Sequence, residues 1–208
     1  MGGLFKGGTD DRWENAARRA QGLADHGVGP VLRRYYTVYF PIGLIALIAT
    51  GAVVTEMVFG DDAEWPESLS GGIILAGIGA LISGLVYNAR TIVPAVEAGR
   101  IGVVMSLRDD ERKGIRRQVL GKEPLVPEHL AVARGFAVQT RKAMETQIVL
   151  LPMLPLVLIP QAFRTDTFIW WLTATAIAIQ VLASIIAVRQ FLQAGRFLAA
   201  TAGQGNTE

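Results

Sequence analysis

Four long apolar runs constrain this chain more than any other feature of its sequence. They cover residues 38–59, 71–88, 147–163 and 168–188, and the only acidic or basic side chain in them is Glu56. A helix needs about 20 predominantly apolar residues to cross a hydrocarbon core of roughly 30 Å. The runs are apolar on every side, whereas helices of a soluble bundle carry a polar face. With 51% hydrophobic residues, the chain is predicted to be an all-α integral membrane protein with four transmembrane helices in two hairpins.

The apolar runs divide the sequence into five segments with different expected environments. In chain order we expect a cytoplasmic N-terminal amphipathic helix and interfacial segment (1–37), a first transmembrane hairpin (38–89) with an acidic external loop (60–70), a basic cytoplasmic helical segment (90–146), a second transmembrane hairpin (147–192) and a cytoplasmic tail (193–208).

Basic residues predict the orientation of these segments. Nineteen of the twenty Lys and Arg residues lie in the N-terminal segment, in the middle segment or after the fourth run, and only Arg164 lies elsewhere. Lys and Arg are retained on the cytoplasmic side of a membrane, so both termini are expected to be cytoplasmic. Arg outnumbers Lys sixteen to four. This composition favours a GC-rich bacterial genome and therefore a bacterial inner membrane. No apolar stretch of a signal peptide precedes residue 38, so the first run is expected to remain as an anchor.

The second run carries a ridge of small side chains at every fourth position. Its members are Gly72, Ala76, Ala80, Gly84 and Asn88. Small residues at this spacing let helix backbones approach closely inside a bilayer. The ridge can pack on the first run, where Gly43 and Gly51 offer a groove that Leu47 interrupts, or it can form the face for a separate partner.

Local signals predict shorter helices outside the apolar runs. Trp13, Ala17 and Ala20 share one face of an N-terminal helix, which can lie in the membrane interface or pack on the protein's own loop. Pro94 marks a break, and Ala95–Met105 is predicted to be a short helix. A capping-type sequence at Ser106–Asp109 opens another helix, which Gly121 ends.

Four prolines affect the helix expected in the third run. Pro127 suits the first turn of a helix that continues through residues 131–145 into this run. Inside the run, Pro152, Pro155 and Pro160 are expected to break or kink the helix.

Two polar residues in the runs are candidates for a conduction pathway. Glu56 lies near the outer end of the first run, and Gln180 lies near the middle of the fourth. Ionisable groups inside a membrane are functional candidates because burying them is unfavourable. Glu56 is also close enough to the boundary to reach the interface, and Gln180 can instead hydrogen-bond a neighbouring helix.

The middle segment contains a basic stripe with two interpretations. Its members are Arg108, Arg112, Lys113, Arg116 and Arg117. Such a stripe beside an inner leaflet attracts the headgroups of anionic lipids. The neighbouring acids Asp109, Asp110 and Glu111 equally favour a solvated helix with internal ion pairs.

The sequence offers little catalytic chemistry. It contains no cysteine, no phosphate-binding loop and only two histidines, His26 and His129, neither in a metal-binding pattern. We therefore expect no cofactor, no metal and no catalytic residues. The expected function is a non-catalytic subunit or scaffold that assembles with itself or with a larger membrane complex, in contact with membrane lipids and not with nucleic acid. A small channel or transporter component using Glu56 and Gln180 is the first alternative, and a membrane-bound enzyme acting on lipid substrates is the second.

Overall fold

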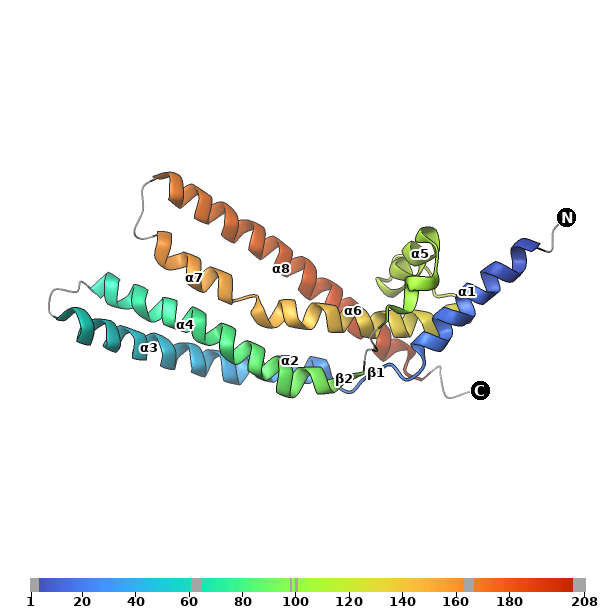
Figure 1. The fold of residues 1–208 in the computed structure, drawn as a ribbon, viewed down its shortest axis with the longest axis horizontal. Coiled ribbons are helices and arrows are strands. Elements are labelled where there is room, and N and C mark those ends of the chain that lie inside the picture. Colours follow the sequence, from blue (N-terminus) through green and yellow to red (C-terminus); the bar gives the residue numbers. More distant parts are fainter. Residues whose placement is uncertain (1–3, 61–64, 98, 100, 163–166, 204–208) are drawn as a thin grey trace. The chain divides into compact units, whose positions relative to one another are not determined.

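The chain folds almost entirely into helices, as the computed structural model in Figure 1 shows. The structure describes residues 4–60, 65–97, 99, 101–162 and 167–203. Its α-helices are α1 (Leu4–Ala20), α2 (Val28–Arg34), α3 (Phe40–Phe59), α4 (Trp65–Tyr87), α5 (Asp109–Val119), α6 (Leu130–Leu150), α7 (Met153–Ala162) and α8 (Thr167–Thr201). Two short strands, β1 (Ala24–Asp25) and β2 (Val96–Glu97), pair antiparallel.

Four helical stretches are long and apolar enough to cross a membrane. They are Val28–Phe59, Ser68–Ala95, Pro127–Pro160 and Thr167–Thr201. This confirms the expectation of an almost entirely helical chain with four helices that are long and apolar enough to span a membrane. The described residues separate into two compact units, one formed by residues 29–92 and 146–187 and the other by residues 1–28, 93–145 and 188–208. We call them the apolar unit and the charged unit.

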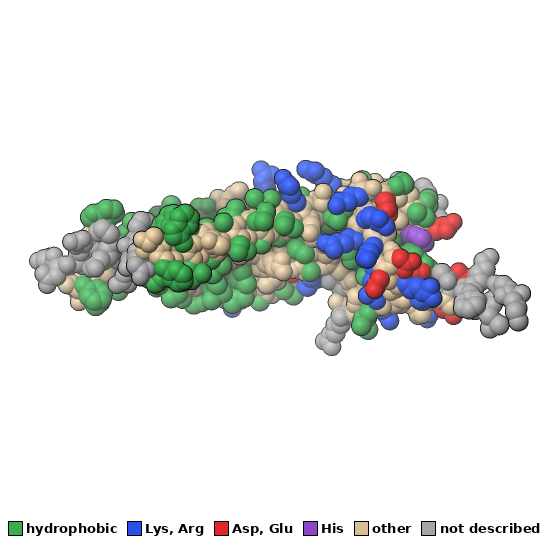
Figure 2. All heavy atoms as spheres, turned by 90° about the horizontal axis from the view of Figure 1, so that it is seen from above, with side chains coloured by type: hydrophobic (Ala, Val, Ile, Leu, Met, Phe, Trp, Pro, Cys, Tyr) green, Lys and Arg blue, Asp and Glu red, His purple; other side chains and the backbone are tan. Residues whose placement is uncertain are grey.

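The apolar unit contains α3, α4, α7 and most of α8, and many of the side chains on its face seen in Figure 2 are hydrophobic. A π-helical turn, Tyr35–Tyr39, leads directly into α3, and a second, Asn88–Ile92, follows α4. Tyrosine hydroxyls in these turns or next to them hydrogen-bond to other helices of the unit. The Tyr87 hydroxyl donates a hydrogen bond to the Val31 carbonyl at 3.1 Å, and the Tyr36 hydroxyl donates one to the carbonyl of Ile148.

The third apolar run is broken where its first proline stands. Helix α6 ends at Leu150 and α7 begins at Met153, so Pro152 occupies the gap. Pro160 lies inside α7. Pro152 therefore divides this span into two helices, as expected, whereas Pro155 and Pro160 lie inside α7 and do not end it. Helix α6 is continuous from Leu130 into the span. A 3₁₀ turn, Pro127–His129, leads directly into α6, and Pro127 is the first residue of that turn.

The charged unit has a small apolar core of its own. Its fully buried members are Ala16, Val103, Leu107, Ile115, Val119, Val132, Ala133, Ala137 and Ala194. Trp13 of α1 packs against this core, and its ring stacks on His129 with 3.6 Å between the ring centroids. The apolar face of α1 is thus covered by the protein itself.

Two local predictions in the charged unit are wrong. Ala95–Met105 does not form the expected helix, because Val96–Glu97 pairs with Ala24–Asp25 as a strand and Gly99 adopts a positive φ of 61°. Among its described residues, a 3₁₀ turn at Val103–Ser106 remains at its end. The next helix, α5, is capped two residues later than expected, at Arg108, whose backbone N–H donates to Glu111 at 2.7 Å. Its predicted stop is confirmed, since Gly121 has a φ of 69° just beyond the helix.

Candidate functional site

The small-residue ridge on α4 brings two helix backbones into direct contact. A Cβ atom placed on Gly72 would lie 2.4 Å from the carbonyl oxygen of Ile48 on α3. A Cβ atom on Gly51 of α3 would lie 2.7 Å from the Cα atom of Gly72. Neither position has room for a side chain, so α3 and α4 meet through their main chains. This is the packing that small residues permit in a bilayer, where van der Waals contact drives helix association.

The remaining ridge residues also face helices of the same unit. Ala76 is 0% exposed and Ala80 is 8% exposed. Gly84 lies against Val149 of α6, and the Asn88 amide donates a hydrogen bond to the Thr146 hydroxyl at 3.1 Å. The chain's own helices therefore contact the ridge at Gly72, Gly84 and Asn88, whereas Ala76 and Ala80 line a cavity between α3 and α4.

Leu47 of α3, which was expected to interrupt the groove for α4, packs against Gly79 of α4. A Cβ atom on Gly79 would lie 2.3 Å from Leu47 Cδ1, so the leucine side chain fills the space above that glycine. Gly79 lies off the four-residue ridge. The second glycine expected in the groove, Gly43, has nothing within 4 Å of its Cβ position. The close approach of α3 and α4 is thus confined to the part of the groove around Gly51.

The structure does not join the two candidate pathway residues. Glu56 is exposed near the end of α3 and has no ion-pair partner among the described residues. Gln180 is half-buried on α8, and its backbone carbonyl accepts a hydrogen bond from the Ser184 hydroxyl at 2.6 Å. No hydrogen bond links Glu56 to Gln180 in the described part of the chain.

Two members of the basic stripe are engaged within the charged unit. The Arg112 guanidinium donates to the carbonyls of Val104 and Met105, each at 2.9 Å. Arg117 Nε lies 3.0 Å from Glu123 Oε1. Arg108, Lys113 and Arg116 have exposed side chains without an acidic partner in the described residues. The side chains open to an external anion are therefore fewer than the sequence pattern indicates.

An ion pair also fastens α1 to α5. Arg12 Nη2 lies 3.4 Å from Glu111 Oε1, and the other carboxylate oxygen of Glu111 accepts the hydrogen bond that caps α5. Partial burial raises the pKa of Glu111, but the hydrogen bonds from Arg108 and Arg12 outweigh it, so the pKa lies below its usual value. Glu111 is therefore a charged structural group at neutral pH.

A buried charge cluster, which sequence reasoning missed, lies in the charged unit. The Arg141 guanidinium of α6 forms an ion pair with Asp25, and the two side chains are only 11% and 9% exposed. The second oxygen of Asp25 accepts hydrogen bonds from the backbone N–H groups of Gly27 and Val28, at 2.9 and 3.0 Å. The Arg141 guanidinium also lies 4.4 Å from the ring centroid of Phe191 on α8. One arginine thus joins the turn after β1 to α6 and α8.

Glu145 extends this cluster by one turn of α6. Its side chain is 1% exposed, its Oε1 atom lies 3.7 Å from Lys142 Nζ, and its Oε2 atom has no hydrogen-bond partner in the described structure. A buried charge is unfavourable unless it is paired. The spacing of Arg141, Lys142 and Glu145 is visible in the sequence, but nothing there assigns Asp25 to them.

No group of three or more His, Cys, Asp or Glu side chains suited to a metal ion occurs in the described ranges. No family model matches the chain, and the comparisons with curated proteins and with solved structures find no match either. The interactions described above are close helix packing and ion pairing. Function has to be inferred from these sites themselves.

Proposed function

We propose that this protein is a non-catalytic membrane subunit or scaffold that assembles with itself or with a larger complex in a bacterial inner membrane. In this proposal the four apolar helices cross the membrane as two hairpins. The charged unit and both termini lie on the cytoplasmic side, because almost all Lys and Arg residues belong to those segments. The loop at 60–70 then faces outward.

One observation carries the proposal, namely the outward face of α3. Only 6% of the most apolar window of this span is buried, compared with 33% of the corresponding window in the α4 span. Ala46, Ala49 and Thr50 are exposed on α3, away from the Gly51 contact. Ala46 and Thr50 lie four residues apart, which is the spacing that lets a second helix approach closely in a bilayer. This face supports assembly with a further transmembrane helix.

The assembly is tested by enlarging this face. Replacing both Ala46 and Thr50 with tryptophan is expected to weaken association about tenfold, because the bulk holds the partner helix away. The measurement is the mass and composition of the particle recovered by gentle detergent extraction. Ile45→Trp is the matched control, since Ile45 is already large and 69% exposed. A wild-type particle containing one chain and no other protein would contradict the proposal, as would unchanged assembly in the double variant.

The orientation is tested with reporter tags. Tags inserted at residues 115 and 205 are expected to report the cytoplasm, and a tag at residue 63 is expected to report the opposite side, because that loop contains no basic residue. Accessibility of each tag to a membrane-impermeant reagent in intact cells gives the result. A cytoplasmic location of residue 63 would contradict this arrangement.

A further inference from the structure

A cavity of about 360 Å³ separates α3 from α4 beyond their backbone contact. Its walls are mainly aromatic and aliphatic. The residues that define them include Tyr39, Phe40, Leu44, Ala80, Val86 and Tyr87. All of these belong to the apolar unit. A volume of this size is within the range of small-molecule sites, about 300–1,000 Å³.

The cavity exists because no described residue fills the space next to Gly43. Around Gly51 and Gly72 the two backbones touch, but a Cβ atom on Gly43, two turns earlier in α3, would meet no atom within 4 Å. The π-helical turns Tyr35–Tyr39 and Asn88–Ile92 both contribute residues to the far end of the cavity. Such turns are rare and frequently occur at functional sites.

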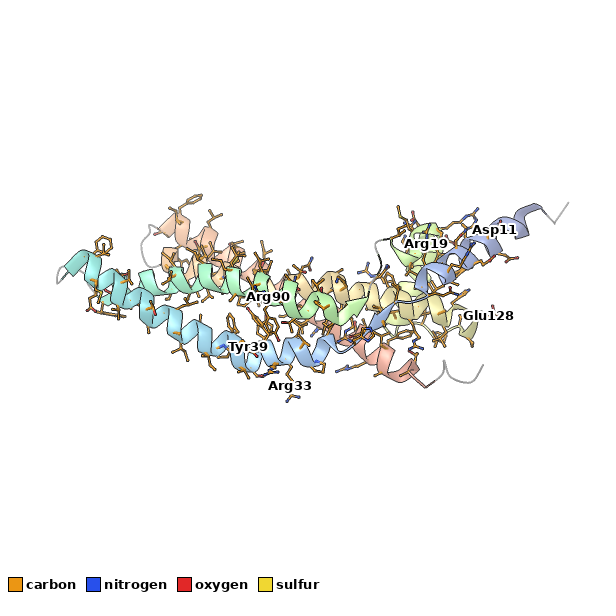
Figure 3. All side chains as sticks on the ribbon, turned by 60° about the horizontal axis from the view of Figure 1, so that its bottom comes forward. Asp11, Arg19, Arg33, Tyr39, Arg90 and Glu128 are labelled. Carbon is orange, nitrogen blue, oxygen red and sulfur yellow. The ribbon has the colours of Figure 1, made fainter. Side chains whose placement is uncertain are left out.

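Positive charge gathers at that same end. Arg90 lines the cavity beside Thr91. The Arg34 guanidinium lies 5.6 Å from the ring centroid of Tyr39, another lining residue. Both arginines are exposed, and neither has an acidic partner among the described residues. Tyr39 and Arg90, which both line the cavity, are labelled in Figure 3 on different helical segments, and the labelled Arg33, the neighbour of Arg34, points away from α4.

We propose that this cavity binds an anionic glycerophospholipid, with one acyl chain between α3 and α4 and the phosphate held by Arg90 and Arg34. The apolar walls suit an acyl chain, and guanidinium groups bind phosphate through charge-assisted hydrogen bonds. Tyrosines at the mouth suit the boundary between chain and headgroup, where one end of the site is apolar and the other is wet. Both lining helices belong to candidate membrane spans, so in the membrane arrangement proposed above lipid is the molecule that meets this surface. The proposal does not depend on assembly with other subunits.

Lipid binding to the detergent-purified full chain tests the site. Native mass spectrometry would follow a titration with palmitoyl-oleoyl phosphatidylglycerol and, separately, with the zwitterionic phosphatidylcholine of the same chains. The wild-type protein is expected to bind phosphatidylglycerol more tightly. Arg90→Gln and Arg34→Gln are each expected to weaken that binding about fivefold, because each removes one basic contact to the headgroup. Arg33→Gln is the matched control for Arg90→Gln, with the same change of charge at an arginine that does not line the cavity.

Gly43→Leu tests the acyl-chain part of the site separately. The new side chain enters open space and so preserves the fold, but it occupies the cavity. Displacing roughly two methylene groups of the lipid is expected to weaken phosphatidylglycerol binding about tenfold. Ala178→Leu adds leucine at an exposed position of α8 outside the cavity and is expected to have no effect. Equal affinity for the two lipids would overturn the anionic selectivity. Unchanged binding by Gly43→Leu, or an equal loss in Arg33→Gln and Arg90→Gln, would overturn the location.

Discussion

Replacing Gly72 with leucine is expected to separate α3 from α4 and to destabilise the apolar unit strongly. The nearest atoms to a new Cβ are main-chain atoms of Ile48 and Ala52, at 2.4 and 3.2 Å, which a rotamer change cannot move. Inserting bulk into a packed interior costs about 1–3 kcal/mol, and more where the backbone has to shift. A loss of about 3 kcal/mol lowers the melting temperature of a chain of this size by about 10 °C.

Gly43→Leu is the matched control for this prediction. It makes the same substitution on the facing helix, but the side chain enters open space. Its melting temperature in detergent is expected to equal that of the wild type or to exceed it slightly, since leucine is a better helix former than glycine. If the Gly72 and Gly43 variants melt at the same temperature, the backbone contact between α3 and α4 does not stabilise the protein.

The four apolar helices are predictable from sequence because length and composition alone determine them. A continuous apolar run of about 20 residues has few alternatives to a spanning helix, since every backbone polar group has to be satisfied within the segment. The break between α6 and α7 follows equally directly from Pro152, which lacks the N–H group that a continuous helix requires. These features need no knowledge of tertiary contacts.

The incorrect predictions fall where distant segments determine local structure. Val96–Glu97 is a strand only because Ala24–Asp25 lies beside it, and no local pattern identifies that partner. The local evidence against a helix in 95–105 is its two glycines, Gly99 and Gly102, because glycine disfavours a helix interior. In the structure Gly99 has a φ of 61°. The cap of α5 differs for a local reason. Glu111 makes the reciprocal contact of a capping box with Arg108, whereas the expected cap assigned that place to Asp109.

The candidate sites also differ in whether a local sequence pattern predicts them. The ridge from Gly72 to Asn88 is visible in sequence because its spacing is regular, and the structure adds which helix each member contacts. The cavity at Gly43 has no sequence signal, because it depends on how far α3 and α4 diverge beyond Gly51. In the sequence, nothing distinguishes Arg141 from the other basic residues of the middle segment. Its burial and its pairing with Asp25 emerge only from the fold of the charged unit.

Arg141→Gln is expected to produce the largest loss of stability in the charged unit. The substitution leaves the Asp25 carboxylate buried and without its cation, and it removes the guanidinium from the Phe191 ring. Breaking a buried ion pair by removing one partner costs about 3–5 kcal/mol. Asp25→Asn is expected to cost less, because the side-chain oxygen still accepts from the Gly27 and Val28 N–H groups. The measurement is the denaturant concentration at which α1 becomes susceptible to protease.

The double variant Asp25→Asn/Arg141→Gln identifies the origin of that loss. Removing both charges leaves neither one buried alone, so the double variant is expected to be more stable than Arg141→Gln. Arg18→Gln is the control, because its pair with Glu14 is exposed, at 64% and 71%, and is expected to contribute less than about 0.5 kcal/mol. Additive losses in the double variant would show that Asp25 and Arg141 act independently. Since burial is what makes an unpaired charge unfavourable, a rescue in the double variant would locate the effect in the charge of Asp25 and not in the lost packing of Arg141.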